Sequence, residues 1–152
     1  MKQSPQDKNL EGMLRSGRLV AGGFLGTDTR SLEEIIAEDS AVLQRLGYNA
    51  SQVAARMQDL RDLARPALGT WIQASEVLEV KSEDYKGIIV CPWPHEGRYE
   101  KRITTAQRLD TGQSISWSDL NIHFVRDHGF FEGRGAFFRI EPEELIKVIF
   151  NG

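Results

Sequence analysis

The chain has 152 residues but only one cysteine and no long apolar run. A single cysteine, Cys91, cannot form a disulfide within the chain, which excludes the cross-linked framework of small secreted proteins. The amino terminus, Met-Lys-Gln-Ser-Pro-Gln-Asp-Lys, lacks the apolar core of a signal peptide. No segment approaches the roughly 20 apolar residues that cross a bilayer. We therefore expect a cytoplasmic protein with no membrane partner.

The chain also lacks an excess of positive charge. Its 19 Lys and Arg are outnumbered by 22 Asp and Glu, which leaves a net charge of −3 with no basic run. This balance argues against a nucleic-acid partner, because binding to phosphate backbones depends on clustered cations. A chain of this length buries roughly 70% of its unfolded surface. The sequence predicts one domain over residues 12–152, preceded by a polar, disordered tail at 1–11.

Signals for helix ends dominate the first half of the chain. Ser31 and Glu34 have the spacing of a capping box, and Gly47 suits the end of the helix that begins there. A second helix is predicted to begin after Asn49 and to close before Pro66, since the residue before proline resists helical geometry. The very short connection predicts a helical hairpin at the amino-terminal side of the domain.

The second half is predicted to hold a small antiparallel sheet followed by short helices. Strand-like runs cover residues 77–80, 87–91, 99–104 and 114–116. A short helix is expected over 118–128, ended by Gly129, and a last helix begins at Pro142. The predicted fold class is α+β, with an N-terminal helical hairpin, a small antiparallel sheet and short C-terminal helices.

Every cysteine and histidine of the chain falls into two tight pairs. Cys91 and His95 enclose the sequence Pro-Trp-Pro, and His123 and His128 lie in the short helix. Zinc accepts thiolate and imidazole ligands in tetrahedral geometry, and one Cys with three His completes four positions. The spacing therefore predicts a metal site, with zinc as the ion.

The helical pair poses a geometric difficulty. Residues five apart on a helix lie about 140° apart, so His123 and His128 share an ion only if the helix ends or tightens before His128. Gly129 favours such an ending. Asp119 and Asp127 each lie one turn from His123, and either one could accept its second ring N–H, as metal-bound histidines usually require.

The glycine-rich loop from 129 to 139 is the other unusual segment. Its four phenylalanines surround one carboxylate, Glu132, and one guanidinium, Arg134, and a second arginine, Arg139, ends the segment. Such a mixture could form an apolar pocket beside the metal. Glu132 would then be the candidate general base on metal-bound water, and Arg134 would orient an anionic group. Alternatively, the phenylalanines fill the core and Glu132 pairs with Arg134 at the surface.

Readings without a metal stay open for the same residues. His128 suits a helix C-terminus through the helix dipole, Cys91 suits a buried thiol, and His95 suits a solvated loop. A thiolate–imidazolium pair formed by Cys91 and a histidine is a further, weaker hypothesis, because no family signature surrounds Cys91.

Two short segments of the sequence resemble segments found in a group of uncharacterised bacterial cytosolic proteins. They are Cys91-Pro-Trp-Pro-His95-Glu-Gly97 and His128-Gly-Phe-Phe-Glu-Gly133. The resemblance implies a bacterial cytosolic origin and brings no activity, ligand or partner.

Three functional hypotheses follow from the sequence. The first is a zinc-binding domain that acts as a binding module for an unknown small molecule or protein. The second is a small zinc-dependent hydrolase with Glu132 as general base. The third is a metal-free α+β domain. Four protein ligands favour the first hypothesis because they leave no open position on the ion.

Overall fold

The protein is described by a computed structural model that covers residues 5–17, 23–95 and 97–150. The helices in this part of the chain are α1 (Pro5–Arg15), α2 (Leu32–Arg45), α3 (Ala50–Ala64), α4 (Asp119–His128) and α5 (Pro142–Ile149), with a 3-10 turn at Arg65–Ala67. The strands are β1 (Ile72–Gln73), β2 (Leu78–Val90), β3 (Arg98–Arg108) and β4 (Ser114–Ser118). All pair antiparallel in the order β1-β2-β3-β4, which confirms the predicted α+β class.

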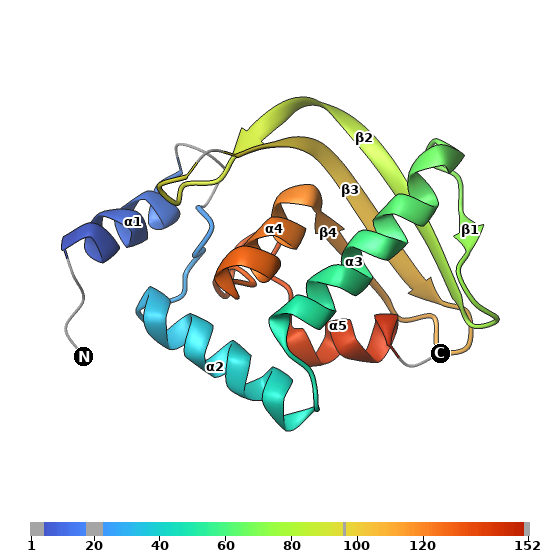
Figure 1. The fold of residues 1–152 in the computed structure, drawn as a ribbon, viewed down its shortest axis with the longest axis horizontal. Helices are drawn as coiled ribbons and strands as arrows, with labels where there is room; N and C mark the ends of the chain where they lie inside the picture. Colours follow the sequence, from blue (N-terminus) through green and yellow to red (C-terminus); the bar gives the residue numbers. More distant parts are fainter. Residues whose placement is uncertain (1–4, 18–22, 96, 151–152) are drawn as a thin grey trace.

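Strands β2 and β3 form a long, bent ribbon that arches over the helices (Figure 1). The runs at 77–80 and 87–91, predicted as separate strands, belong to one strand, β2. The register with β3 shifts between Tyr85 and Ile88, so the expected break is a bulge within continuous pairing. The ribbon extends past the short strands β1 and β4 and ends in the loop that contains Cys91 and His95.

Local capping sets the starts of three helices. The side chains of Ser31, Asn49 and Ser118 each accept the backbone N–H three residues on, and the side chain at that third position accepts the N–H of the capping residue. These reciprocal bonds satisfy amides that have no partner inside the helix. Helices α2 and α3 follow each other across a short turn as predicted, but they diverge (Figure 1). The main contacts of α3 are with α4 and β2, and those of α2 are with α5.

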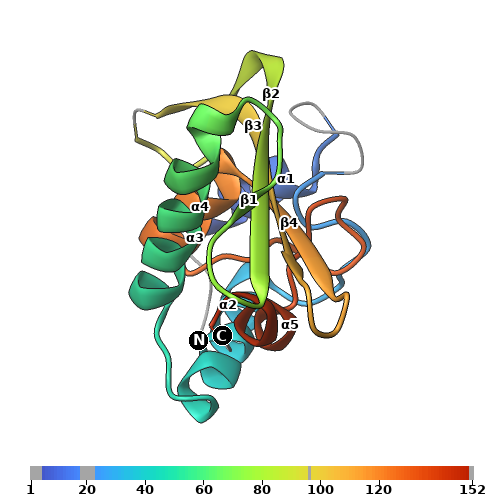
Figure 2. The ribbon, with the colours of Figure 1, turned by 90° about the vertical axis from the view of Figure 1, so that its right-hand side faces the viewer.

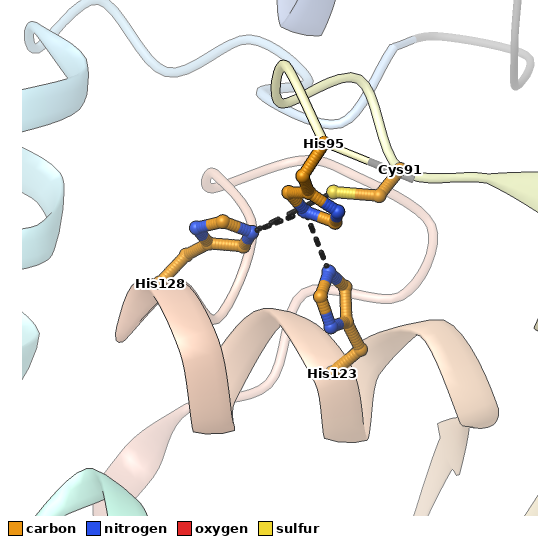
Figure 3. A group of neighbouring side chains, drawn as sticks. All are labelled: Cys91, His95, His123 and His128. Atoms are coloured by element: carbon orange, nitrogen blue, oxygen red, sulfur yellow. Dashed lines mark hydrogen bonds between the residues drawn. The ribbon is translucent and has the colours of Figure 1, made fainter. Parts of the chain in front are cut away.

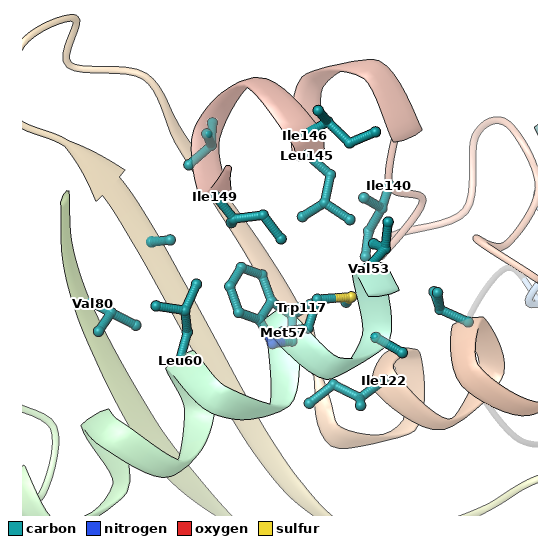
Figure 4. Packing of buried hydrophobic residues seen from close by; sticks show 14 of the residues in the cluster. Val53, Met57, Leu60, Val80, Trp117, Ile122, Ile140, Leu145, Ile146 and Ile149 are labelled. Atoms are coloured by element: carbon teal, nitrogen blue, oxygen red, sulfur yellow. The ribbon is translucent and has the colours of Figure 1, made fainter. Parts of the chain in front are cut away.

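The larger core lies between the sheet and helices α3, α4 and α5, centred on the fully buried ring of Trp117 (Figure 4). From α3 come Met57 and Leu60, and from α5 comes Ile149, all at most 1% exposed. Their 3–4-residue spacing gives each helix one apolar stripe facing the sheet. Burial of such side chains is the main favourable contribution to folding of this half of the domain.

A second core forms on the other side of α4. Its centre is Phe124, whose ring packs edge-on against Phe24 and Phe130 with centroids 5.2 Å apart in both cases. Cys91 belongs to this cluster. Helix α4 therefore lies between two cores, and all six residues from Leu120 to Val125 are buried.

The first helix differs from the prediction of a disordered tail at residues 1–11. Residues 5–15 form α1, and residues 1–4 lie outside the described residues. Leu14 is fully buried in the second core, and its carbonyl accepts the N–H groups of Phe24 and Leu25. Glu11 accepts the N–H of Leu32 at 2.7 Å. These contacts are made to segments 10 to 21 residues away. The polar sequence of α1 therefore contains no local pattern that predicts them.

We predict that Leu14→Ala lowers the free energy of unfolding by about 2–5 kcal/mol, because it opens a cavity in a closed core. The neighbouring Met13 is 50% exposed, so Met13→Ala should change that free energy by no more than about 0.5 kcal/mol. Urea unfolding of both variants measures the difference. Equal, small effects would show that α1 does not contribute to the folded domain.

Candidate metal centre

The first half of the site is the loop that follows β2. Cys91 comes directly after the strand and is 3% exposed in the second core. The N–H of His95 donates to the carbonyl of Trp93 at 2.8 Å, which closes a tight turn. Pro92 and Pro94 restrict the backbone on either side of Trp93. The turn brings the imidazole of His95 back over the thiol of Cys91.

The second half of the site is the carboxyl-terminal half of α4. The helix continues through His128. From the sequence, the two histidines were expected to share an ion only if the helix ended or tightened before that residue. It stops at Gly129, which adopts the left-handed conformation at φ 60°, and Phe130 N–H donates to Phe124 C=O across the cap. The Cα–Cβ bonds of helical residues tilt toward the helix start, so the ring of His128 leans back over the last turn. Its ring centroid lies 5.0 Å from that of His123.

The four side chains point at one place, as Figure 3 shows. Nε2 of His95 lies 3.1 Å from Nε2 of His128 and 3.1 Å from Nε2 of His123. The sulfur of Cys91 lies 3.7 Å from Nε2 of His128. All four potential ligand atoms are within 4.8 Å of one another, so the group could hold a metal ion.

These separations are close to those of a tetrahedral ion. Bonds of about 2.0–2.1 Å to nitrogen and about 2.3 Å to sulfur place ligand nitrogens about 3.3 Å apart, and sulfur about 3.6 Å from nitrogen. The observed nitrogen separations of 3.1 Å and the sulfur–nitrogen separation of 3.7 Å differ from these by only about 0.1–0.2 Å. These three separations fit a tetrahedral ion, and the others among the four atoms are at most 4.8 Å.

Hydrogen bonding among the histidines does not account for the contacts of His95. A ring nitrogen carries either one N–H or one lone pair in the ring plane, so it makes one strong hydrogen bond. Nε2 of His95 faces two other Nε2 atoms at 3.1 Å. A cation between the three nitrogens would accept a lone pair from each and remove this conflict.

The protonation states of the buried ligands suit a metal. Burial lowers the pKa of His128 to about 4 and also lowers the pKa of His123, so both rings are neutral at neutral pH. Burial raises the pKa of the Cys91 thiol to about 11. The thiol is therefore protonated without a metal, and coordination must displace its proton. The C-terminal end of α4 carries partial negative charge, which favours a cation at His128.

Asp127 is the carboxylate placed to orient His123. Its Oδ2 lies 2.8 Å from Nδ1 of His123, the ring nitrogen that faces away from the cluster. The N–H of this nitrogen does not point straight at the oxygen, so the contact is not an ideal hydrogen bond. Asp119, the other candidate, instead accepts both a 2.8 Å and a 3.2 Å bond from the guanidinium of Arg61. The pairing of Asp127 with His123 fixes which nitrogen points at the cluster.

Two aromatic rings hold the imidazoles in place. Trp93 stacks on His128 with centroids 4.0 Å apart and an interplanar angle of 11°. Tyr99 stacks on His123 with centroids 4.6 Å apart. These roles of Trp93 and Tyr99 were not predicted from the sequence, although Trp93 lies between the predicted ligands Cys91 and His95. The stacked rings restrict the rotation of both histidines, which prepares the site for an ion.

Glu132 and Arg134 are not part of this cluster. Glu132 is 4% exposed and accepts a 2.6 Å hydrogen bond from Nδ2 of Asn121. Asn121 and His123 are two residues apart on α4 and so lie on nearly opposite faces of the helix. Arg134 is exposed, and its backbone N–H donates to Asp28. The structure therefore brings the four predicted metal ligands together and separates them from the predicted base.

The phenylalanines of the loop divide between core and surface. Phe130 and Phe131 are fully buried, as expected for residues that fill the core, whereas Phe137 is 86% exposed. The alternative expectation of a surface pair between Glu132 and Arg134 is not met, because the carboxylate of Glu132 bonds to Asn121.

Comparison with family models, with curated proteins and with solved structures found no match to this chain. Among the helices of the described residues, none is both long enough and apolar enough to pass through a membrane. The function of this protein must therefore be inferred from the geometry of its own residues.

We predict that addition of Zn²⁺ near neutral pH releases about one proton per ion, because the Cys91 thiol is protonated in the free protein and ionised in the complex. The apparent affinity should rise about tenfold per pH unit between about pH 7 and pH 9, as protons compete less for the sulfur. Titration in a weakly buffered indicator solution measures the released proton. Cys91→Ser should abolish the release, and an unchanged release in that variant would refute the role of the thiol.

Proposed function

We propose that the protein is a zinc-binding domain in which the ion is structural, and that the domain serves as a binding module for a small molecule or a protein. The observation that carries the proposal is the convergence of one sulfur and three Nε2 atoms within 4.8 Å, from two segments about 30 residues apart. Four protein ligands complete a tetrahedral zinc site without a bound water.

The chemistry of the donors favours zinc among the common ions. A thiolate with imidazoles is unsuited to Mg²⁺ and Ca²⁺, which prefer oxygen ligands. Tetrahedral sites of sulfur and nitrogen are typical of zinc. The site also has a clear mechanical use. It would join the far end of the β2–β3 ribbon, at Cys91 and His95, to the end of α4, at His123 and His128.

A hydrolytic role has weaker support. It requires an open position on the ion and a base beside it, and Glu132 lies on the opposite side of α4 from His123. His95 is the one exposed ligand, so replacement of its imidazole by water is the route by which the site would open. Cobalt substitution separates the two roles, because a four-coordinate Co²⁺ ion gives much stronger visible absorption than a five-coordinate one.

The first experiment is the metal content of untagged protein by mass spectrometry. We expect about one equivalent of zinc in the wild type and its loss in His123→Ala, because His123 is the most deeply buried of the three imidazoles. Arg45→Ala is the control, since Arg45 is an exposed residue of α2 that offers no ligand. Wild-type protein that takes up no zinc under reducing conditions would refute the proposal.

Removal of the ion should destabilise the domain. A ligand that binds only the folded state stabilises it by about 4 kcal/mol at a thousandfold excess over its dissociation constant. Chelation of zinc should therefore lower the melting temperature of the wild type and leave that of His123→Ala unchanged. An equal melting temperature with and without zinc would contradict a structural role.

The Asp127–His123 contact gives a separate prediction. Asp127→Asn keeps the side-chain size but removes the negative charge beside Nδ1, so zinc affinity should fall about 10–100-fold. Asp62→Asn is the control, because it removes an exposed carboxylate that lies 3.2 Å from an arginine on α3. Competition with a coloured chelator measures both affinities. Equal affinities in the two variants would show that Asp127 does not orient the ligand.

A further inference from the structure

Only one of the two carboxyl oxygens of the buried Glu132 accepts a hydrogen bond from the described residues. Its Oε2 accepts the bond from Asn121, and no other group in the described residues bonds to Oε1. The amide of Asn121 cannot turn round, because its Oδ1 already accepts from the N–H of Ser118 at 2.8 Å and from its hydroxyl at 3.0 Å. Asn121 therefore presents an N–H to Glu132 and leaves one carboxyl oxygen without a partner.

In the part of the chain that the structure describes, no cation bonds to this carboxylate. The nearest candidate is Arg139, whose guanidinium is held by Asp39 at 2.6 Å and 3.0 Å and by Glu141 at 3.1 Å. Its remaining contact with Glu132 is a 2.8 Å bond to the backbone carbonyl. Burial raises the pKa of Glu132 to about 7, although the hydrogen bond from Asn121 and the charge of Arg139 both act to lower it. Among the described residues, this buried acid thus has no ion-pair partner bonded to its carboxylate.

The backbone around Glu132 is strained and held in place. Glu132 has φ 66°, in the left-handed region that non-glycine residues rarely adopt, and such strain persists where the surroundings enforce it. The next residue, Gly133, lies so close to Leu25 that a Cβ would come within 2.3 Å of the Leu25 carbonyl oxygen. Gly133 N–H also donates to the carbonyl of Phe24. Figure 2 shows this α4–α5 loop beside the segment that leads into α2.

Glu132 lies on a groove of about 1450 Å³. One wall is the sheet surface that faces away from the helices, where Ile103 and Thr105 alternate with the buried residues of β3. The other wall combines the apolar side chains of Phe24, Leu120 and Phe138 with Glu132 and Arg139. A concave, partly apolar surface with one recessed ionisable group is the usual form of a small-molecule site.

The rim of this groove carries an aromatic ring in water. Phe137 is 86% exposed, and its ring packs edge-on against Phe138 with centroids 4.8 Å apart. A ligand with an apolar body would cover both rings and so gain the burial that the fold does not provide for Phe137. The rim is thus a second observation, independent of Glu132, that points to a bound molecule.

We propose that this groove binds a small organic amine whose protonated nitrogen donates to Oε1 of Glu132 and whose apolar body packs on Phe138 and Phe137. The choice of a cation follows from charge complementarity, because no cation of the described residues bonds to the recessed carboxylate and the guanidinium of Arg139 is held by Asp39 and Glu141. On the sheet wall of the groove, Lys81 pairs with Glu83 at 3.2 Å. The site lies apart from the metal centre and does not depend on it.

The test uses benzylamine as the probe, with benzyl alcohol and benzoate as analogues of similar size that lack the cation. Chemical-shift mapping of the isotope-labelled, zinc-loaded protein should show saturable binding of benzylamine, with the largest shifts at Glu132, Leu120 and Phe138. Benzyl alcohol and benzoate should bind at least about tenfold more weakly, because a hydrogen bond to a charged group is worth that factor or more.

Two variants and a control complete the test. Glu132→Gln can still accept from Asn121 but cannot carry a negative charge, so benzylamine should lose at least about tenfold in affinity and its advantage over benzyl alcohol. Phe137→Ala alters an exposed side chain, so the fold should be kept while affinity falls about threefold. Glu83→Gln alters an exposed carboxylate of β2 that pairs with Lys81, so it should leave the affinity unchanged.

Absence of saturable benzylamine binding to the wild type would overturn the proposal. Equal binding of the amine and the alcohol would also overturn it, as would full affinity in Glu132→Gln. Zinc content is measured on the same samples, which keeps the two proposals separate. A folded protein that binds benzylamine but no zinc would refute the metal site and leave the amine site standing.

Discussion

The burial of helix α4 from both sides is the constraint on which the rest of the structure depends. Ile122 and Val125 face the core below the sheet, while Leu120 and Phe124 face the aromatic core that contains Cys91. A ten-residue helix in such a position cannot rotate or slide without opening one core or the other. Every polar side chain on it is therefore presented in a fixed direction.

Two polar features of the molecule use this fixed helix in opposite directions. His123 and His128 point toward the end of the β2–β3 ribbon, where Cys91 and His95 complete the candidate metal centre. Asn121 points the other way and holds Glu132 at the groove. One rigid element thus positions both sites and keeps them apart, because Asn121 and His123 lie on nearly opposite faces of the helix.

The convergence of the four candidate metal ligands was predictable from the sequence. All three histidines and the single cysteine occur in two short segments, so few arrangements of the chain could use them separately. The role of Glu132 was not predictable. Sequence proximity to His128 suggested a base beside the ion, but Gly129 turns the chain at the end of α4, and Phe130 and Phe131 enter the cores. That turn carries Glu132 to the far side of the helix.

The sequence by itself determined the starts of α2, α3 and α4 and the grouping of the four candidate metal ligands. Ser31, Asn49 and Ser118 specify helix starts through hydrogen bonds that reach only three residues along the chain. Only the tertiary structure decided that residues 5–15 form a helix and that Asn121 holds Glu132. Those outcomes rest on contacts between segments that are distant in sequence or lie beyond a turn. The free energy of such contacts comes from the burial of side chains between distant segments, which cannot be predicted from a local sequence pattern.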